Sequence, residues 1–225
     1  MTAYAELQVT SNFSFLRGAS HPEELVATAA ALGYRAVAIT DRNTLAGVVR
    51  VHAVAKLAEI RLVVGARLDL DDGPSLLCFP TDRAAYGRLS RLLTVGRRRA
   101  PKGECRLALA DVLAHGDGQI LVALPPADLL TETAEAAAFA AALDRLSRHF
   151  EGRLYLALHK LYRGADDRRL AALVALAEAQ RIPLVATNDV HTHVPGRRPL
   201  QDVLTCIREG CTLATAGFRP HANAE

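Results

Sequence analysis

Two short apolar runs end in side chains that could bind a metal ion. The stretch Leu184–Val190 contains Asp189 near its end and is followed by His191. The run Val37–Thr40 is followed directly by Asp41. Apolar runs of this length predict buried strands. Loops at the carboxyl ends of strands converge in β/α proteins, and carboxylate and imidazole groups ligate divalent metals. A site at these strand ends is therefore our first hypothesis.

Strand and helix patterns alternate along the whole chain. Strands are expected over about 5–10, 36–40, 62–64, 75–79, 120–124, 154–158 and 184–190, and helices over about 20–32, 45–57, 84–93, 109–113, 131–149, 167–181 and 200–208. Ser20 is expected to cap the first helix, with Glu23 completing a capping box. About seven strands in βαβ order favour a closed or distorted (β/α) barrel over an open sheet. No linker composition divides the chain, so we expect one domain over 1–211 and a tail over 212–225.

Net charge, cysteine spacing and the length of the apolar runs argue against a strongly basic nucleic-acid-binding protein, a disulfide-stabilised protein and a membrane protein. The 225 residues carry a net charge of only +3, which gives no global attraction to nucleic acid. The four cysteines form no C-x-x-C pair, which favours free thiols in a reducing, cytoplasmic setting. The first residues have no signal-peptide pattern, and no apolar run approaches the ~20 residues of a membrane span. We therefore expect no membrane partner.

Several stretches resemble the polymerase-and-histidinol-phosphatase (PHP) domain. Residues 7–20, Leu-Gln-Val-Thr-Ser-Asn-Phe-Ser-Phe-Leu-Arg-Gly-Ala-Ser, resemble its opening motif, in the form found at the front of bacterial error-prone, polymerase III alpha-like DNA polymerases. Residues 38–43, 96–105, and 188–193 with 197–202 support the same resemblance. It implies a distorted (β/α)7 barrel of PHP type. Active members of the family hold up to three metal ions and hydrolyse phosphoesters, including from a 3′ end.

Three of the family's ligand positions keep a suitable side chain. These are Asp41, from an Asp-His motif, and Asp189 with His191, from an intact Asp-x-His motif. They are candidate metal ligands, but we favour the interpretation of Asp189 and His191 as a hydrogen-bonded pair that holds the strand ends together. Asp41 is expected to form an ion pair with Arg42 or Arg67 in place of metal bonds.

The remaining ligand positions of the family do not keep a ligand. In the family they hold the two histidines of a His-x-His motif, the histidine of the Asp-His motif, and a Glu, a His and a Cys. In chain order the departures are Gln8, Thr10, Arg42, Arg67 and, more loosely aligned, Ser75 and Pro126. Amide and hydroxyl groups are weak ligands for these metals, and a guanidinium repels a metal ion. We expect no tightly bound cofactor and no catalytic residue, and leave weak binding of Zn, Mn or Mg open. Arg67 is expected to pair with Asp41 or Asp189.

A basic segment over 96–103 is predicted to be a loop. Its cations are either solvated or contact phosphate groups of nucleic acid. The candidates are Arg97, Arg98, Arg99 and Lys102. His21, His159 and His193 show no metal-ligand spacing and are expected at the surface or at helix caps.

The resemblance implies that the complete protein is a DNA-directed DNA polymerase, an error-prone nucleotidyltransferase that serves DNA replication, repair of DNA damage and translesion synthesis. The chain lacks the family's palm domain, so we expect a metal-poor scaffold without polymerase activity that packs against the downstream polymerase region. The helix near 200–208 and residues near Phe218 are expected to leave an apolar patch. Two alternatives stay open: a residually active metal-dependent phosphoesterase or 3′–5′ exonuclease, and an independent partner-binding module.

Overall fold

A computed structural model describes residues 4–126, 133–160, 162 and 164–220. It has a mixed α/β fold. The internal contacts divide the chain into two compact units, one formed mainly by 1–64 and 187–225, the other by 65–160 and 164–186. We describe each unit by itself.

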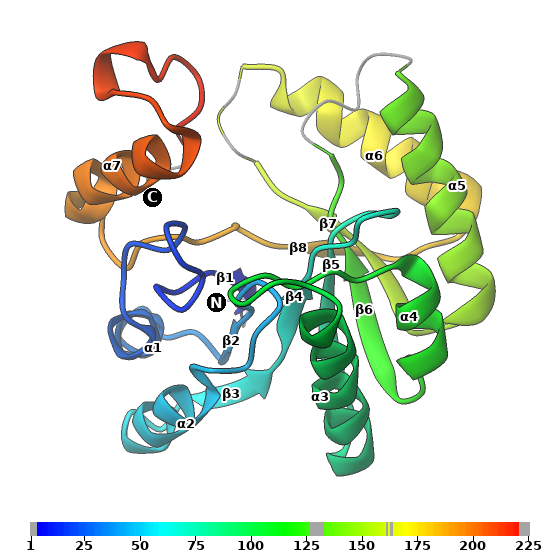
Figure 1. Cartoon of the computed structure of the whole chain (residues 1–225), viewed down its shortest axis with the longest axis horizontal. Helices are drawn as coiled ribbons and strands as arrows, with labels where there is room; N and C mark the ends of the chain where they lie inside the picture. Colours follow the sequence, from blue (N-terminus) through cyan, green and yellow to red (C-terminus); the bar gives the residue numbers. More distant parts are fainter. Residues whose placement is uncertain (1–3, 127–132, 161, 163, 221–225) are drawn as a thin grey trace. The chain divides into compact units, whose positions relative to one another are not determined.

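The first unit is built on a parallel sheet of three strands, in the order β1 (Ala5–Val9), β2 (Ala36–Ile39) and β3 (Arg61–Val64). Parallel neighbours need a crossover connection, and α1 (Pro22–Ala31) and α2 (Val48–Leu57) supply the two that this sheet requires. Figure 1 shows both helices beside the sheet.

The core of the first unit lies where these helices pack on the sheet. All four residues of β2 are buried, which is why its sequence, Ala-Val-Ala-Ile, is continuously apolar. The helix α1 contributes Leu25, Val26 and Ala29, spaced to share one face, and α2 contributes Val51. Burying a side chain of the size of Leu or Val contributes roughly 1.5–3 kcal/mol.

The C-terminal part of the first unit holds the 3-10 turn η1 (Pro195–Arg197), the helix α7 (Arg198–Glu209) and the 3-10 turn η2 (Leu213–Thr215). The helix α7 ends at Gly210, whose φ of 62° lies in the left-handed region. Glycine reaches this conformation without steric cost, so it is the residue expected to stop a helix here.

The second unit is built on a mixed sheet of five strands. Their order is β4 (Ala66–Leu68), β5 (Leu76–Pro80), β6 (Gln119–Ala123), β7 (Leu154–Leu158) and β8 (Leu184–Ala186). The strand β5 is antiparallel to both of its neighbours, β4 and β6, whereas β6, β7 and β8 are parallel to one another.

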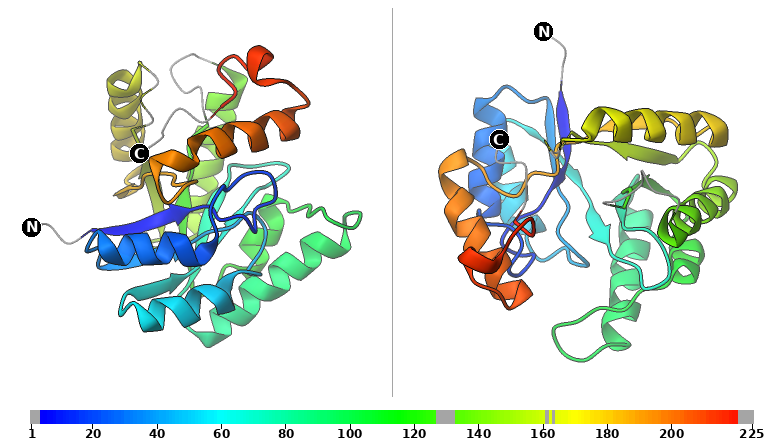
Figure 2. Two further views of the ribbon diagram at one scale, coloured as in Figure 1. Left: turned by 90° about the vertical axis from the view of Figure 1, so that its left-hand side faces the viewer. Right: turned by 90° about the horizontal axis from the view of Figure 1, so that it is seen from above.

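Four helices belong to the second unit: α3 (Arg83–Arg98), α4 (Leu109–His115), α5 (Ala134–His149) and α6 (Asp166–Gln180). The side chains of Asp82 and Thr133 cap α3 and α5 by accepting backbone hydrogen bonds of 2.7 and 3.1 Å. The helices α5 and α6 lie side by side (Figure 1, Figure 2). None of the helices in the described part of the chain is long and apolar enough to cross a membrane.

The α/β class is confirmed, but the strand pairing differs from the prediction. The described strands number eight, in two sheets, and their pairing shows no closed (β/α)7 barrel. The strand β4, which has only three residues, was not predicted from the sequence. The antiparallel pairing of β5 with β4 and β6 was therefore not predicted either. The strand expected over 184–190 ends at Ala186, and Asp189 beyond it has a φ of 48°. The boundary at 211/212 stays a prediction, and the tail's residues 221–225 lie outside the described residues.

Two local predictions were wrong. The basic segment is not a loop throughout, because α3 continues through Arg98. The first helix is capped one residue later than expected, since the backbone N–H of His21 donates to Glu24 at 2.8 Å. Ser20 instead contacts the ring Nδ1 of His193 at 2.8 Å, so that histidine is held in the fold.

Candidate functional site

Asp41 follows β2 and is 3% exposed. Its carboxylate accepts three hydrogen bonds, from the Ser11 N–H at 2.9 Å and from the Ser11 and Ser14 hydroxyls at 2.6 Å each. Burial raises the pKa of Asp41, although these hydrogen bonds act in the opposite direction. Within its own unit the acid is held by hydroxyl groups and a backbone amide, and not by Arg42 as one expectation had it. The expected pair with Arg67, which belongs to the second unit, stays a prediction.

Gln8, which the resemblance led us to align with an imidazole of the family, links β1 to the segment after β8. Its side-chain N–H donates to Asp189 Oδ1 at 2.6 Å, and its side-chain oxygen accepts from the Thr187 hydroxyl at 2.8 Å. Two backbone bonds, from Thr10 to Val190 and from Val190 to Gln8, lie in the same place. The residue is 3% exposed, so both of its polar ends are satisfied inside the unit.

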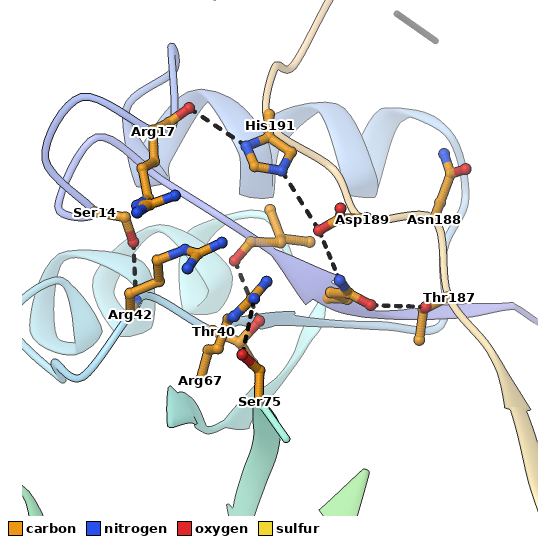
Figure 3. A network of polar contacts seen from close by, with 12 residues as sticks. Ser14, Arg17, Thr40, Arg42, Arg67, Ser75, Thr187, Asn188, Asp189 and His191 are labelled. Atoms are coloured by element: carbon orange, nitrogen blue, oxygen red, sulfur yellow. Dashed lines mark hydrogen bonds and ion pairs between the residues drawn. The ribbon is translucent and has the colours of Figure 1, made fainter. Parts of the chain in front are cut away.

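Asp189 and His191 lie together, as the Asp-x-His spacing suggested (Figure 3). The distance between His191 Nε2 and Asp189 Oδ1 is 3.4 Å. The other ring nitrogen, Nδ1, lies 3.3 Å from the Arg17 carbonyl oxygen. The left-handed backbone at Asp189 turns the chain so that Val190 can bridge to Val9. Both ring nitrogens therefore face oxygen atoms, and the pair fastens the loop over 11–20.

Glu6 is a buried acid that the sequence analysis did not single out. Its carboxylate accepts hydrogen bonds from the Tyr4 hydroxyl at 2.7 Å, the Gln8 N–H at 2.8 Å and the Asn188 N–H at 3.1 Å. Burial is the main reason that the pKa of Glu6 is raised, and the nearby charge of Asp189 adds to it. Glu6 alternates with apolar residues in β1, as a solvent-exposed acid would, so its burial could not be predicted from the sequence pattern.

These residues do not fit a multimetal centre. The carboxylates of Asp41 and Asp189 both accept hydrogen bonds from neighbouring side chains, and the amide of Gln8 is the donor to Asp189. Over residues 4–126, 133–160, 162 and 164–220, no three or more His, Cys, Asp or Glu residues are grouped so that they could hold a metal ion. The chemistry of this site is hydrogen bonding between elements distant in sequence.

In the second unit, Arg67 has partners other than those predicted. Its Nε donates to Asp69 Oδ1 at 2.8 Å and its Nη2 donates to the Ser75 hydroxyl at 3.1 Å. The Ser75 hydroxyl in turn donates to Asp69 at 2.7 Å. Asp69 is two residues from Arg67 and thus takes the role we expected of Asp41 or Asp189.

Arg67 and Ser75 also line a cavity of about 390 Å³ in the second unit. Pro126 and Phe139 form part of its apolar wall. Arg67, Ser75 and Pro126, which the resemblance led us to align with ligand positions of the family, therefore line one cavity.

The basic cluster lies at the end of α3 and beyond it, and its cations are exposed. Arg99 makes a bidentate ion pair with Asp111: its Nη1 donates to Oδ2 at 2.5 Å and its Nη2 donates to Oδ1 at 2.8 Å. That hydrogen bond is the main reason that the pKa of Asp111 is lowered. Arg99 is thus already engaged, while the role of the cluster in binding nucleic acid stays a prediction.

Comparison with known families decides the classification. The PHP domain family matches residues 6–160. The chain belongs to this family. The match spans both units and includes Gln8, Asp41 and Arg67.

The full-length relatives are bacterial error-prone DNA polymerases. The chain is 54% identical over 223 residues to an error-prone DNA polymerase of Caulobacter vibrioides, and 52% identical over 228 residues to one of Rhodopseudomonas palustris. Each match covers 99% of this chain and 20% of the relative. The chain therefore spans about a fifth of the length of these relatives, and it matches their N-terminal region.

Solved structures share the fold at low sequence identity. One is a protein from Bifidobacterium adolescentis considered to be a metal-dependent phosphoesterase, with a TM-score of 0.62 and 17% identity over 85% of this chain and 88% of that one. Another is an amidohydrolase from Chromobacterium violaceum, with a TM-score of 0.57 and 15% identity over 84% and 88%. At this identity the likeness concerns the fold alone.

Proposed function

We propose that the chain is the structural PHP domain of an error-prone DNA polymerase and does not itself hydrolyse phosphoesters. The complete protein would be a DNA-directed DNA polymerase that acts on damaged templates. The identity of about one half to polymerases of this kind, over nearly the whole chain, supports this parentage.

One observation carries the structural role. At the strand ends where the family places metal ligands, this chain places groups that bind one another. Gln8 donates to Asp189, and the serines of the 11–20 loop donate to Asp41. Each such bond holds the same elements together that a shared metal ion would hold. Hydrogen bonds to a charged group contribute about 1.5–3 kcal/mol each, so the network replaces the structural part of a metal's role without its Lewis acidity.

The partner is proposed to be the downstream polymerase region, contacted through α7. Leu200, Val203 and Ile207 are 41%, 39% and 60% exposed, and they follow one another at helical spacing on one face of α7. An apolar stripe of this kind is the surface by which a helix packs on another element. Phe218, in the segment after the helix, is also fully exposed.

Metal content and activity test the absence of hydrolysis. The chain, purified without chelator, should hold less than one equivalent of Zn, Mn and Fe in total and should not cleave a generic phosphodiester. The matched variant combines Gln8→His, Thr10→His and Arg42→His, which restores the family's ligand types beside Asp41, Asp189 and His191. Gain of metal by the variant alone supports the proposal. Two or more tightly bound ions in the unchanged chain would instead favour the alternative, a metal-dependent phosphoesterase or exonuclease.

The scaffold role is tested by supplying the downstream polymerase region as a separate chain. Ile207→Glu places a charge in the α7 stripe and should weaken the complex by at least about tenfold, which is roughly 1.4 kcal/mol. Leu57→Glu is the matched control, because Leu57 is 83% exposed and lies at the end of α2, away from the stripe in sequence. Equal binding by both variants and the unchanged chain would show that α7 is not the docking surface.

A further inference from the structure

The end of α7 brings two cysteines together. The backbone N–H of Cys211 donates to the Cys206 carbonyl at 3.0 Å, and the N–H of Gly210 donates to the Ile207 carbonyl at 3.4 Å. With Gly210 left-handed, this is the Schellman arrangement, in which the third residue before the helix end and the second residue after it make a side-chain contact. Those two residues here are Cys206 and Cys211.

The two thiols are in contact, and they differ in access. Cys206 is 5% exposed, whereas Cys211 is half-buried. Burial, together with a hydrogen bond to Cys211, raises the pKa of Cys206. A charge on Asp202 acts in the same direction and one on Arg219 opposes it. The more accessible sulfur therefore belongs to Cys211, with a shielded thiol directly beside it.

We propose that Cys206 and Cys211 form a reversible intramolecular disulfide, so that the end of α7 is a redox-modified site. The oxidant is a low-molecular-weight disulfide. The thiolate of Cys211 attacks it, forms a mixed disulfide and releases one small thiol. Cys206 then loses its proton and attacks the Cys211 sulfur, which releases the second small thiol. Two protein thiols are oxidised to one disulfide, and one small disulfide is reduced to two thiols.

The bond would lock the part of the unit that carries exposed apolar surface. Ile207 lies next to Cys206 on the last turn of α7, and the segment after Cys211 folds back so that Ala216 is 4% exposed and Arg219 lies near Cys206. Reduced, this junction is held by backbone hydrogen bonds and by the contact of two thiols. Oxidised, it is held covalently, and the last turn can no longer fray away from the segment that follows.

The test is oxidation of the whole chain with oxidised glutathione, followed by intact mass and peptide mapping. We expect a product lighter by two hydrogens, without attached glutathione. Because Arg208 lies between the two cysteines, tryptic digestion should give two peptides joined by one disulfide, and a reductant should separate them. Cys206→Ser should stop at the mixed disulfide on Cys211. Cys105→Ser, which removes the other half-buried thiol, should leave the internal disulfide unchanged.

Other products would overturn the proposal. A mixed disulfide at Cys211 that persists in the unchanged chain would show that the two thiols are merely an apolar contact at the helix end. Dimers linked through Cys211 would show that the accessible thiol prefers another chain. Cys78 does not compete, because it is 1% exposed and burial raises its pKa to about 12.

Discussion

Asp41 offers the sharpest test of the proposal that hydrogen bonds, and not a metal ion, hold these strand ends together. In Asp41→Ala, one N–H and two hydroxyls lose their acceptor inside the unit. At about 1–3 kcal/mol for each buried group left unsatisfied, and with some relaxation, we expect a loss of about 3–5 kcal/mol. Asp41→Asn keeps one oxygen for Ser11 N–H and Ser14, and its amide can donate to the Ser11 hydroxyl. Charge-assisted bonds become neutral ones, but the cost of burying the charge is removed as well, so we expect a loss of no more than about 1 kcal/mol.

The assay is urea unfolding of the three proteins, followed by circular dichroism, at several pH values. Burial holds the folded-state pKa of Asp41 above its unfolded value of about 3.9. Ionised Asp41 therefore costs stability at a pH above its folded pKa, and this cost disappears as the pH falls below the unfolded value. The stability difference between the unchanged chain and Asp41→Asn should shift in favour of the unchanged chain as the pH falls through that window. Glu6, whose pKa is also raised, is present in both proteins and cancels to first order.

A metal site predicts a different outcome for the same proteins. If Asp41 were a metal ligand, Mn or Zn at a hundred times its dissociation constant would stabilise the unchanged chain by about 2.7 kcal/mol. Both variants would lose that increment. We expect no such stabilisation in any of the three. A metal-dependent increase confined to the unchanged chain, or equal losses in Asp41→Asn and Asp41→Ala, would refute the hydrogen-bond account.

Two further predictions follow from the second unit. Arg67→Ala should cost about 1–2 kcal/mol in urea unfolding, because its ion pair with Asp69 is only partly buried; Arg106→Ala, which breaks a more exposed pair with Asp71, should cost less than about 0.5 kcal/mol, and equal losses would count against the structural role of Arg67. The isolated chain should bind single-stranded DNA weakly, and replacing the exposed cations by Ala should lower the salt slope by roughly 0.7 for each phosphate contact. The variant replaces Arg97, Arg98 and Lys102. It leaves Arg99 on Asp111, and an unchanged slope would show that these cations do not contact phosphate groups.

Much of the fold was predictable from the sequence, because it depends on short-range periodicity. The apolar runs of β2 and β7 and the spacing of Leu25 and Ala29 in α1 are local patterns with one geometric solution each. The errors occur where local signals are weak. Three residues of β4 carry too little pattern to predict a strand, and the arginines that end α3 have side chains equally suited to a loop. Which strands pair, and in which direction, depends on contacts between residues far apart in the chain.

The candidate site also has a part that the sequence predicts and a part that depends on the tertiary structure. The sequence by itself predicted that Asp189 and His191, two residues apart, lie close together. Its resemblance to the family also led us to expect Gln8 and Arg67 at ligand positions. Only the tertiary structure decided which groups bind one another at these strand ends. Ser11 and Asp41 are 30 residues apart, and Gln8 and Asp189 are 181 apart, so no local pattern could pair them. Serine and glutamine are common on protein surfaces, so their presence in the sequence does not indicate a structural role. Burial gives them that role, because an unpaired polar group inside the protein lowers the stability of the folded state, whereas a hydrogen-bonded one does not.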